Sequence, residues 1–366
     1  VGADNLELAG DLAAEGDDLP LLLQIAGWFQ GGVESPLFQF ANRMQGSSNS
    51  RFAVNGVFDA DLQNGDVQVS GLSAEGLGLT LSGELNAAQM NGRNGSVEGA
   101  LQLQGDELGS LLVALEQSAL GEVLQAISVD VQLSGSRTNL RLSPARLELL
   151  VTGVQNPGIS TPLSIDAETI LNLEQETLEI GSFSASGLGV DLTGQVSAES
   201  LFDGPLVSGH LELADMNLRN LLQQLNQPVP ETADPEVLNR VALSTDFAGS
   251  ANSIELQQLV VRLDDTNLTG SAVVADIANQ ASEFALQIDQ INLDRYLPQD
   301  EPAATSTAEV PATEIPAEQL RQLTLDGRLQ VGHLIASGLT LSDLDVSFSA
   351  ANGELTVAPL SMNLYE

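Results

Sequence analysis

The side chains that most often carry out chemistry are rare in this sequence. It has no cysteine and only two histidines, His210 and His333. Each histidine lies within a stretch that alternates like a β-strand, and two histidines without cysteine make a poor metal site. We therefore interpret both as structural or surface residues and predict no metal centre.

Two pairs of neighbouring carboxylates, Asp17–Asp18 and Asp264–Asp265, are the next candidates. Paired carboxylates can act as an acid and a base, or bind calcium. Neither pair has the spacing of an EF-hand loop, and the Gly-Gly-x-Gly-x-Asp repeat of calcium-binding β-rolls does not occur. We interpret both pairs as solvated loop charges.

Two Gly-x-Gly motifs, Gly76–Gly78 and Gly187–Gly189, could belong to a dinucleotide-binding loop. Such a loop leads into a helix whose N-terminus binds the phosphates, whereas strand-like sequence surrounds both motifs. Bends between strands are the favoured interpretation. Since no other constellation of reactive side chains occurs, the sequence predicts a protein that is not an enzyme and needs no cofactor.

The charge composition excludes nucleic acid as a partner. Twelve basic residues, all arginine, and fifty acidic ones give 12 − 50 = −38, whereas binding to phosphates needs positive charge. The same charge argues against docking on an anionic membrane through a basic patch. Because 43% of the residues are hydrophobic, the chain is nevertheless not of the disordered class. No apolar run reaches the roughly 18 residues of a membrane span.

Alternation of apolar and polar residues with a period of two dominates the chain. Because successive side chains of a strand point to opposite sides, each segment has one apolar and one polar face. Sheets with one solvated face are usually antiparallel. Polar neighbours such as Thr80, Thr193 and Gln287 should face water. The apolar face, predicted to be buried or to line a groove, contains Val67, Val69, Leu77, Leu79, Leu81, Val129, Val131, Leu133, Leu171, Leu173, Leu178, Ile180, Val190, Leu192, Leu211, Leu213, Leu286, Ile288, Leu339, Leu341, Val346 and Phe348.

An internal repeat organises these strands. Three segments align without gaps, beginning at Val67, Leu178 and Ile254, with Gly83, Gly194 and Gly270 in the same place. Each is followed by a strand and a short helix-like tail with two leucines at i, i+4 spacing, which share one helical face. The tails begin near Asp106, Asn217 and Asp294, which can cap a helix. The uneven spacing of the repeats argues against a solenoid of fixed coil length.

Three polar or proline-rich stretches are interpreted as loops: Asn42–Ser50, Asn226–Pro235 and Gln299–Ala317. The last has three prolines among Ala, Thr and Glu, and is the best linker candidate. We therefore predict a repeated β-strand and short-helix region over residues 1–298, a flexible Pro/Ala-rich linker over 299–317, and a further strand unit over 318–366.

A sheet with one apolar face must cover that face, and the short helices are too few to do so. Two arrangements satisfy this requirement. Either the sheet closes on itself or on a second sheet, as in a sandwich or β-helix, or it curls into a trough whose apolar surface is left for a ligand. The residue pattern alone leaves both open.

Two segments, Phe284–Pro302 and Gln319–Glu366, resemble the AsmA family of bacterial envelope proteins. The specific parts are Leu293–Pro298, Leu325–Gly327, the leucines Leu339, Leu341 and Leu344, and the stretch from Asn352 to Tyr365. In the family, Leu-Tyr is typically followed by glycine, whereas this chain ends at Glu366, as a truncated unit would. The upstream residues match the family only in their glycine-punctuated amphipathic strands.

The resemblance implies a periplasmic protein that an N-terminal helix tethers to the inner membrane. It also implies a role in outer-membrane biogenesis, a likeness to bridge-like lipid-transfer proteins, and no catalytic residues. We therefore expect a mainly β fold, with a long antiparallel, curled, trough-like sheet and short amphipathic α-helices.

The expected function is to hold or conduct lipid, such as phospholipid, along an apolar groove between the two membranes, with possible envelope partners. One alternative is a non-catalytic scaffold with a filled core that regulates the targeting of outer-membrane proteins. A weaker third is an acidic, secreted β-solenoid adhesin. A long unfilled apolar groove would favour the first, a closed core the second, and a regular stack of coils the third.

Overall fold

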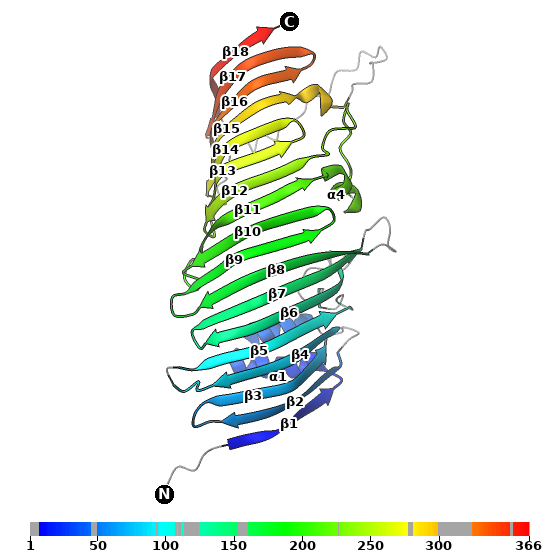
Figure 1. Cartoon of the computed structure of the whole chain (residues 1–366), viewed down its shortest axis with the longest axis vertical. Coiled ribbons are helices and arrows are strands. Elements are labelled where there is room, and N and C mark those ends of the chain that lie inside the picture. Colours follow the sequence, from blue (N-terminus) through cyan, green and yellow to red (C-terminus); the bar gives the residue numbers. More distant parts are fainter. Residues whose placement is uncertain are drawn as a thin grey trace. The chain divides into compact units, whose positions relative to one another are not determined.

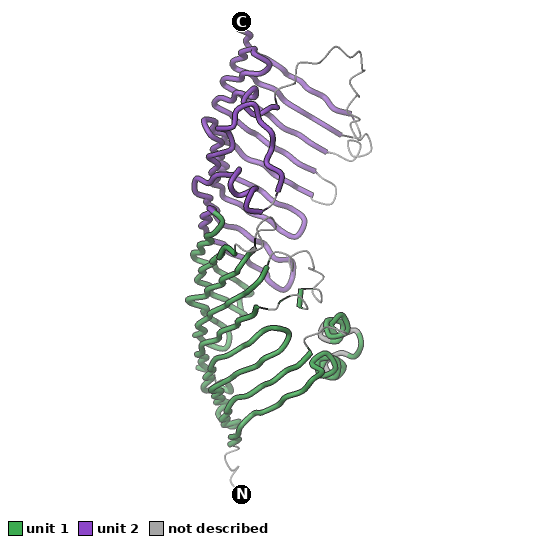
Figure 2. The backbone as a smooth tube through the Cα atoms, turned by 90° about the vertical axis from the view of Figure 1, so that its right-hand side faces the viewer, with its two compact units in different colours: residues 1–188 green, residues 189–366 purple. Residues whose placement is uncertain are grey.

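The computed structural model describes residues 7–44, 50–92, 94–106, 108, 111–112, 124–152, 160–225, 227–276, 281–298, 324–351 and 354–365. The chain divides into two compact units, residues 1–188 and 189–366 (Figure 2). It is 69% strand and 10% helix, which confirms the predicted mainly β class. The predicted linker over 299–317 lies outside the described residues.

Unit 1 consists of a β-sheet and a helical hairpin inserted after its first strand (Figure 1). Its elements are β1 (Glu7–Gly16), α1 (Leu19–Gly31), the 3-10 helix η1 (Gly32–Glu34), α2 (Pro36–Arg43), β2 (Phe52–Asp61), β3 (Asp66–Gly76), β4 (Leu79–Ala88), β5 (Ser96–Gly105), β6 (Leu124–Ser136), β7 (Asn139–Thr152), β8 (Ser160–Asn172) and β9 (Thr177–Gly187). Every strand pairs antiparallel with the next one along the chain.

Unit 2 has the same plan, with short helical segments between some strands. Its elements are β10 (Val190–Glu199), β11 (Leu206–Met216), α4 (Leu218–Gln224), β12 (Val241–Gly249), β13 (Ile254–Leu263), β14 (Thr266–Asp276), β15 (Ala281–Asn292), the 3-10 helix η3 (Leu293–Arg295), β16 (Thr324–Ala336), β17 (Leu339–Ala351) and β18 (Glu354–Tyr365). Asn217 caps α4 by accepting a hydrogen bond from the Asn220 backbone N–H at 2.9 Å, as expected from the sequence.

One pair of strands departs from the predicted antiparallel order. β15 and β16 are parallel, with Ile288 opposite Val331, whereas the other neighbouring strands of unit 2 are antiparallel. A parallel pair cannot be joined by a tight hairpin and requires a crossover connection. Residues 293–323 provide that connection. Alternation within a strand is the same for both directions, so the sequence pattern could not reveal this exception.

Tight turns join several strands and fix how they pair. Between β3 and β4 the loop is Leu77–Gly78, with φ of 63° and 76°. Between β16 and β17 it is Ser337–Gly338, with φ of 52° and 76°. Two central residues with positive φ characterise the type I′ turn, whose twist matches that of the strands. The first Gly-x-Gly motif is therefore part of a hairpin.

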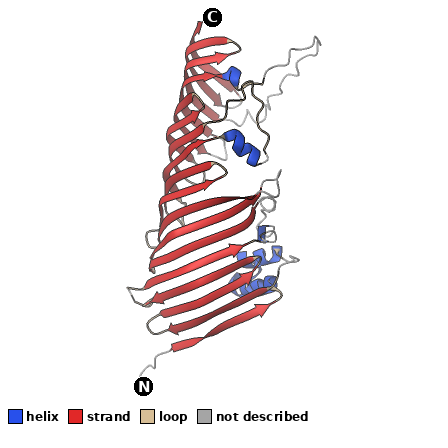
Figure 3. Cartoon of the chain, turned by 45° about the vertical axis from the view of Figure 1, so that its right-hand side comes forward, coloured by secondary structure: helices blue, strands red, loops and turns tan. Residues whose placement is uncertain are grey.

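The strands also bend in their middle, and glycine permits the bend. Gly83 and Gly270, equivalent in the internal repeat, have φ of 154° and 152°, and a Cβ at either would collide with the carbonyl oxygen of the neighbouring strand's Ala100 or Ala285. The strand preceding each glycine carries a register shift opposite it. Bulges increase local twist and bend a strand. They account for the curled, open sheet, visible in each unit in Figures 2 and 3, which confirms the predicted curl.

The helices of unit 1 pack at one end of its strands. A small core contains Met44 and Leu77, with Leu19, Leu23, Phe40 and Leu111 packed against it. The side chain of Leu19 reaches to 2.8 Å from where a Cβ of Gly76 would lie. The hairpin α1–α2 therefore packs against the turn that joins β3 and β4.

A substitution tests whether glycine makes the bend. Gly270→Ala should destabilise the protein by about 2 kcal/mol or more, because the new Cβ would meet the Ala285 carbonyl and φ is 152°. Gly181→Ala is the matched control, since no heavy atom lies within 4 Å of its added Cβ, and should change stability by no more than about 0.5 kcal/mol. Urea unfolding measures both. Equal effects of the two substitutions would contradict this origin of the bend.

Candidate functional site

The candidate site is one face of each sheet, which we call the apolar face. Directly paired residues of neighbouring strands point to the same side of a sheet. In unit 1, one such row crosses β4 to β8 and contains only apolar residues. It comprises Leu81, Leu103, Val129, Leu147 and Ile165, each paired with the next. Apolar character therefore continues across strands as well as along them.

The opposite face of the same strands is polar. The adjacent row comprises Thr80, Gln104, Ser128, Glu148 and Ser164, again paired in sequence order. Thr80, Gln104 and Glu148 are exposed, whereas all five apolar residues of the neighbouring row are half-buried. The two rows differ by one residue in each strand, so a slip of one residue would exchange them.

Unit 2 has its own apolar face, built in the same way. Its central row comprises Leu192, Leu213, Leu243, Val261, Leu268, Ile288, Val331 and Leu344. The row passes through the parallel pair β15–β16 without interruption. The adjacent polar row begins with Thr193, Glu212 and Ser244.

Most of the residues predicted for the apolar face are half-buried. Of the 22, only Leu77 and Val346 are buried, and only Leu173 and Leu339 are exposed, by 39% and 49%. Leu77 lies in a turn against the helices, Leu173 follows the last residue of β8, and Leu339 is the first residue of β17. Three of the four predicted residues that are not half-buried therefore lie at strand ends or in turns.

The two units bury few side chains completely. Met44 and Val237 are the only large side chains under 2% exposed among the described residues. The accessible surface is 23047 Å², whereas about 14000 Å² is expected for a globular protein of this mass. Apolar side chains that would form the interior of a globular domain thus keep part of their surface accessible.

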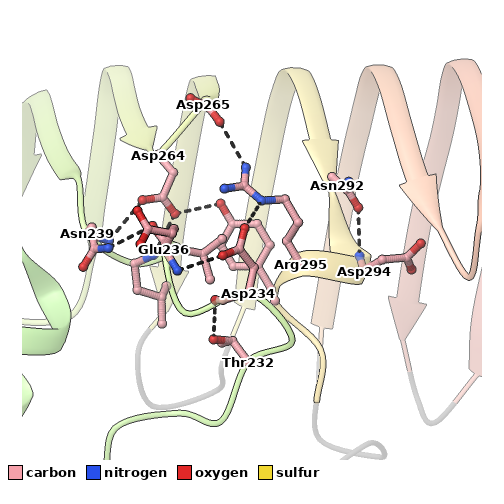
Figure 4. Close-up of polar contacts among 12 residues, drawn as sticks. Thr232, Asp234, Glu236, Asn239, Asp264, Asp265, Asn292, Asp294 and Arg295 are labelled. Carbon is pink, nitrogen blue, oxygen red and sulfur yellow. Dashed lines mark hydrogen bonds and ion pairs between the residues drawn. The ribbon is translucent and has the colours of Figure 1, made fainter. Parts of the chain in front are cut away.

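A polar network at the strand ends of unit 2 surrounds Asp264 (Figure 4). This carboxylate is buried and accepts hydrogen bonds from the backbone N–H groups of Leu238, Asn239 and Arg240, at 2.7, 3.1 and 3.2 Å. It also accepts one from the Tyr296 hydroxyl at 2.9 Å. The interpretation of Asp264 as a solvated loop charge is therefore wrong, because the chain folds back and supplies it with donors.

Arg295 and Asp294 extend this network. The Arg295 guanidinium contacts Asp234 at 2.7 Å and Asp265 at 3.0 Å. The Asp294 carboxylate accepts hydrogen bonds from the backbone N–H groups of Ser337 and Gly338, in the β16–β17 turn. The sequence predicted Asp294 as the cap of this helical turn. In the structure the cap is Asn292, whose side chain accepts a hydrogen bond from the Asp294 backbone N–H at 3.1 Å. Residues 294–296 thus hold the start of the crossover.

The remaining chemical candidates are surface groups. His210 lies on the polar face, with Nδ1 2.7 Å from Asp246 Oδ1 on the neighbouring strand, and His333 is exposed. Asp17 pairs with Arg51 at 3.0 Å, and Asp18 caps α1. Within the described residues, no three His, Cys, Asp or Glu side chains are grouped to bind a metal.

Ionisation supports a structural role for the strand-end network. Burial, together with the neighbouring Asp264 carboxylate, raises the pKa of Tyr296 to about 12. Hydrogen bonds from the Glu236 backbone and from Arg295 lower the pKa of Asp234. On the polar face, the Arg328 guanidinium lowers the pKa of Asp345 to about 2. Hydrogen bonds and charges of the neighbouring residues thus favour the neutral form of Tyr296 and the ionised forms of Asp234 and Asp345.

An open sheet with one apolar and one polar face, punctuated by short helices at its strand ends, defines a class of non-globular amphipathic β-proteins. Residues 206–366 match the sequence model of the AsmA family, which supports assigning the chain to this family. Neither curated proteins nor solved structures gave a match. This match supports an envelope-associated protein. Among the described residues, no helix is both long and apolar enough to span a bilayer.

The titration of Tyr296 gives a test of the network. Its pKa is raised from about 10 to about 12 in the folded state, so its contribution to stability is complete below pH 10 and is lost as the pH rises toward 12. Tyr296→Phe should cost about 1 kcal/mol at pH 8 and should reduce the loss of stability between pH 10 and 12. Urea unfolding at several pH values measures this. Parallel pH profiles for the two proteins would contradict the assignment.

Proposed function

We propose that this protein holds or conducts lipid, with phospholipid as the cargo, along the apolar faces of its curled sheets. The observation that carries the proposal is the unbroken apolar row of each unit, which is half-buried except at the buried Val331 and has no second layer packed on it among the described residues. A soluble protein rarely keeps so large an apolar surface accessible unless it binds something there.

The physical need for such a surface is large. A phospholipid with two acyl chains has on the order of 30 methylene groups, and exposing each to water costs about 0.8 kcal/mol, or about 24 kcal/mol in total. A continuous apolar surface removes most of this barrier. The polar headgroup would remain at the accessible edge, beside the charged strand ends. Binding of this kind needs no catalytic residue and no cofactor.

We further propose the periplasm as the compartment, with a tether to the inner membrane and with cargo moving between the two membranes. The match to the AsmA family supports an envelope location, and the resemblance described above supports the periplasm and the tether. Outer-membrane or other envelope partners are part of the same proposal. The alternative function, a scaffold with a filled core that acts on outer-membrane protein assembly, makes a different prediction for a charge placed in the apolar row.

Leu192→Asp places that charge. Leu192 is half-buried in the central apolar row, paired with Leu213, while its neighbour Thr193 is exposed on the polar face. On an open face the carboxylate can reach water, so the protein should remain folded. Bound lipid should fall at least about tenfold, which corresponds to a loss of about 1.4 kcal/mol in binding free energy. Thr193→Asp is the matched control and should leave lipid content unchanged.

The measurements are the melting midpoint and lipid mass spectrometry after organic extraction of each purified protein. A companion assay asks whether the full-length variants restore envelope integrity in a strain that lacks the protein. In a filled core, the buried unpaired charge would cost several kcal/mol and unfold the protein, which would favour the scaffold. A folded Leu192→Asp variant with unchanged lipid and full activity would exclude lipid conduction.

A further inference from the structure

Helix α1 turns apolar side chains toward solvent. Leu21, Ile25 and Trp28 follow the i, i+4, i+7 spacing of one helical face, and they are 51%, 49% and 59% exposed. Leu22, beside them, is 44% exposed. We call these four residues the α1 patch. A helix on the surface of a soluble protein normally places its polar side chains outward, so the patch needs an explanation.

The other face of α1 is fixed by packing, so the helix cannot rotate to hide the patch. Pro20 and Gly27 are buried, and a Cβ at Gly27 would lie 2.5 Å from the backbone nitrogen of Phe38 in α2. Gln24 donates a hydrogen bond to Asn42 of α2 at 3.1 Å. The close contact between the two helices thus selects which face of α1 remains accessible.

The two other α-helices with described side chains show the normal arrangement. In α2, Gln39, Asn42 and Arg43 are exposed while Ala41 is buried. In α4 of unit 2, the exposed residues are Asn220, Gln223 and Gln224. An outward apolar face is therefore a particular property of α1, and not a general consequence of placing short helices at the strand ends.

Charge indicates what covers the patch. Residues 19–31 contain no charged side chain, although the protein carries a net charge of −38. A second copy of the protein would bring the same charge and be repelled, and so would an anionic bilayer. At about 1.5 Å per residue, α1 is about 20 Å long, too short to span a bilayer but suited to lie in its interface. Tryptophan prefers that interface.

The patch adjoins the apolar face of unit 1. Leu19, two residues before the patch, packs beside Gly76, which lies in an apolar row with Phe52 and Leu79. A hollow of about 630 Å³ opens at these strand ends, and its lining contains Phe52, Gly76 and Leu79 together with charged residues such as Asp17 and Arg51. Leu19 thus places the helix beside the end of the apolar face, next to the charged residues of the same hollow.

From this juxtaposition we propose that the α1 patch docks into the interface of a neutral, zwitterionic bilayer. The helix then acts as a membrane-contact site at which lipid can pass to the apolar face of unit 1. The docking step stands on the helix alone. Only the passage of lipid onto the sheet rests on the proposed function.

Trp28 provides the probe, because it is the only tryptophan in the chain. Adding phosphatidylcholine vesicles to the protein should shift its fluorescence to shorter wavelength, and brominated acyl chains should quench it. Vesicle flotation measures the affinity. The double variant Leu21→Ser/Ile25→Ser should bind at least about tenfold more weakly. Phe202→Ser, which removes an apolar side chain 69% exposed in unit 2, is the matched control and should bind as the wild type does.

Three outcomes would overturn the proposal. The first is no spectral shift and no flotation of the wild-type protein. The second is equal binding by the double variant and the control. The third is dissociation of an oligomer by the double variant in analytical ultracentrifugation, which would assign the patch to a second copy.

The test is separable from that of the lipid-conducting function. If the double variant no longer floats but still retains lipid supplied from detergent micelles, the patch acts in docking while the apolar face is intact. If Leu192→Asp retains its lipid while the wild type still docks, lipid conduction fails and the membrane contact stands.

Discussion

The structure depends on one constraint: every strand must present its apolar side chains to the same side as its neighbours. Because side chains alternate with a period of two, a shift of one residue would reverse the faces. In β3 the apolar positions change parity, from Val67 and Val69 to Leu72 and Ala74, and a register shift opposite β4 lies between them. The bulge that bends the strand therefore also keeps its apolar residues on one side.

The strand ends carry the polar chemistry that the apolar face cannot hold. Asp264 gathers three backbone donors and the Tyr296 hydroxyl, while Asp294 binds the turn that follows the crossover. A parallel pair of strands needs such a crossover, and its start must be fixed for β16 to align with β15. The motif Leu293–Pro298, which carries much of the resemblance to the AsmA family, thus fixes the start of the crossover in this protein.

The strong acidity and the accessible apolar faces are complementary. An open sheet risks pairing and aggregating through its edges and its apolar side. A net charge of −38 keeps copies apart by mutual repulsion. The charges named above lie on the polar face and at the strand ends, where all but the buried Asp264 are accessible to water, so they do not interrupt the apolar rows. An accessible apolar face can in this way coexist with a highly charged polar face.

The sequence by itself determined the mainly β class, the two-faced strands, the repeat and the resemblance to the AsmA family, because alternation, glycine placement and a short motif are local signals. Tertiary structure alone decided the parallel pairing of β15 with β16, since the alternation of apolar and polar residues does not depend on the direction of the strand. It also decided that Asp264 is buried, because its donors at residues 238–240 and its partner Tyr296 are distant in sequence. The outward face of α1 likewise follows from its contact with α2. Residues 19–31 are mostly apolar and carry no charge, so the sequence marks no polar face and packing selects the face that remains exposed.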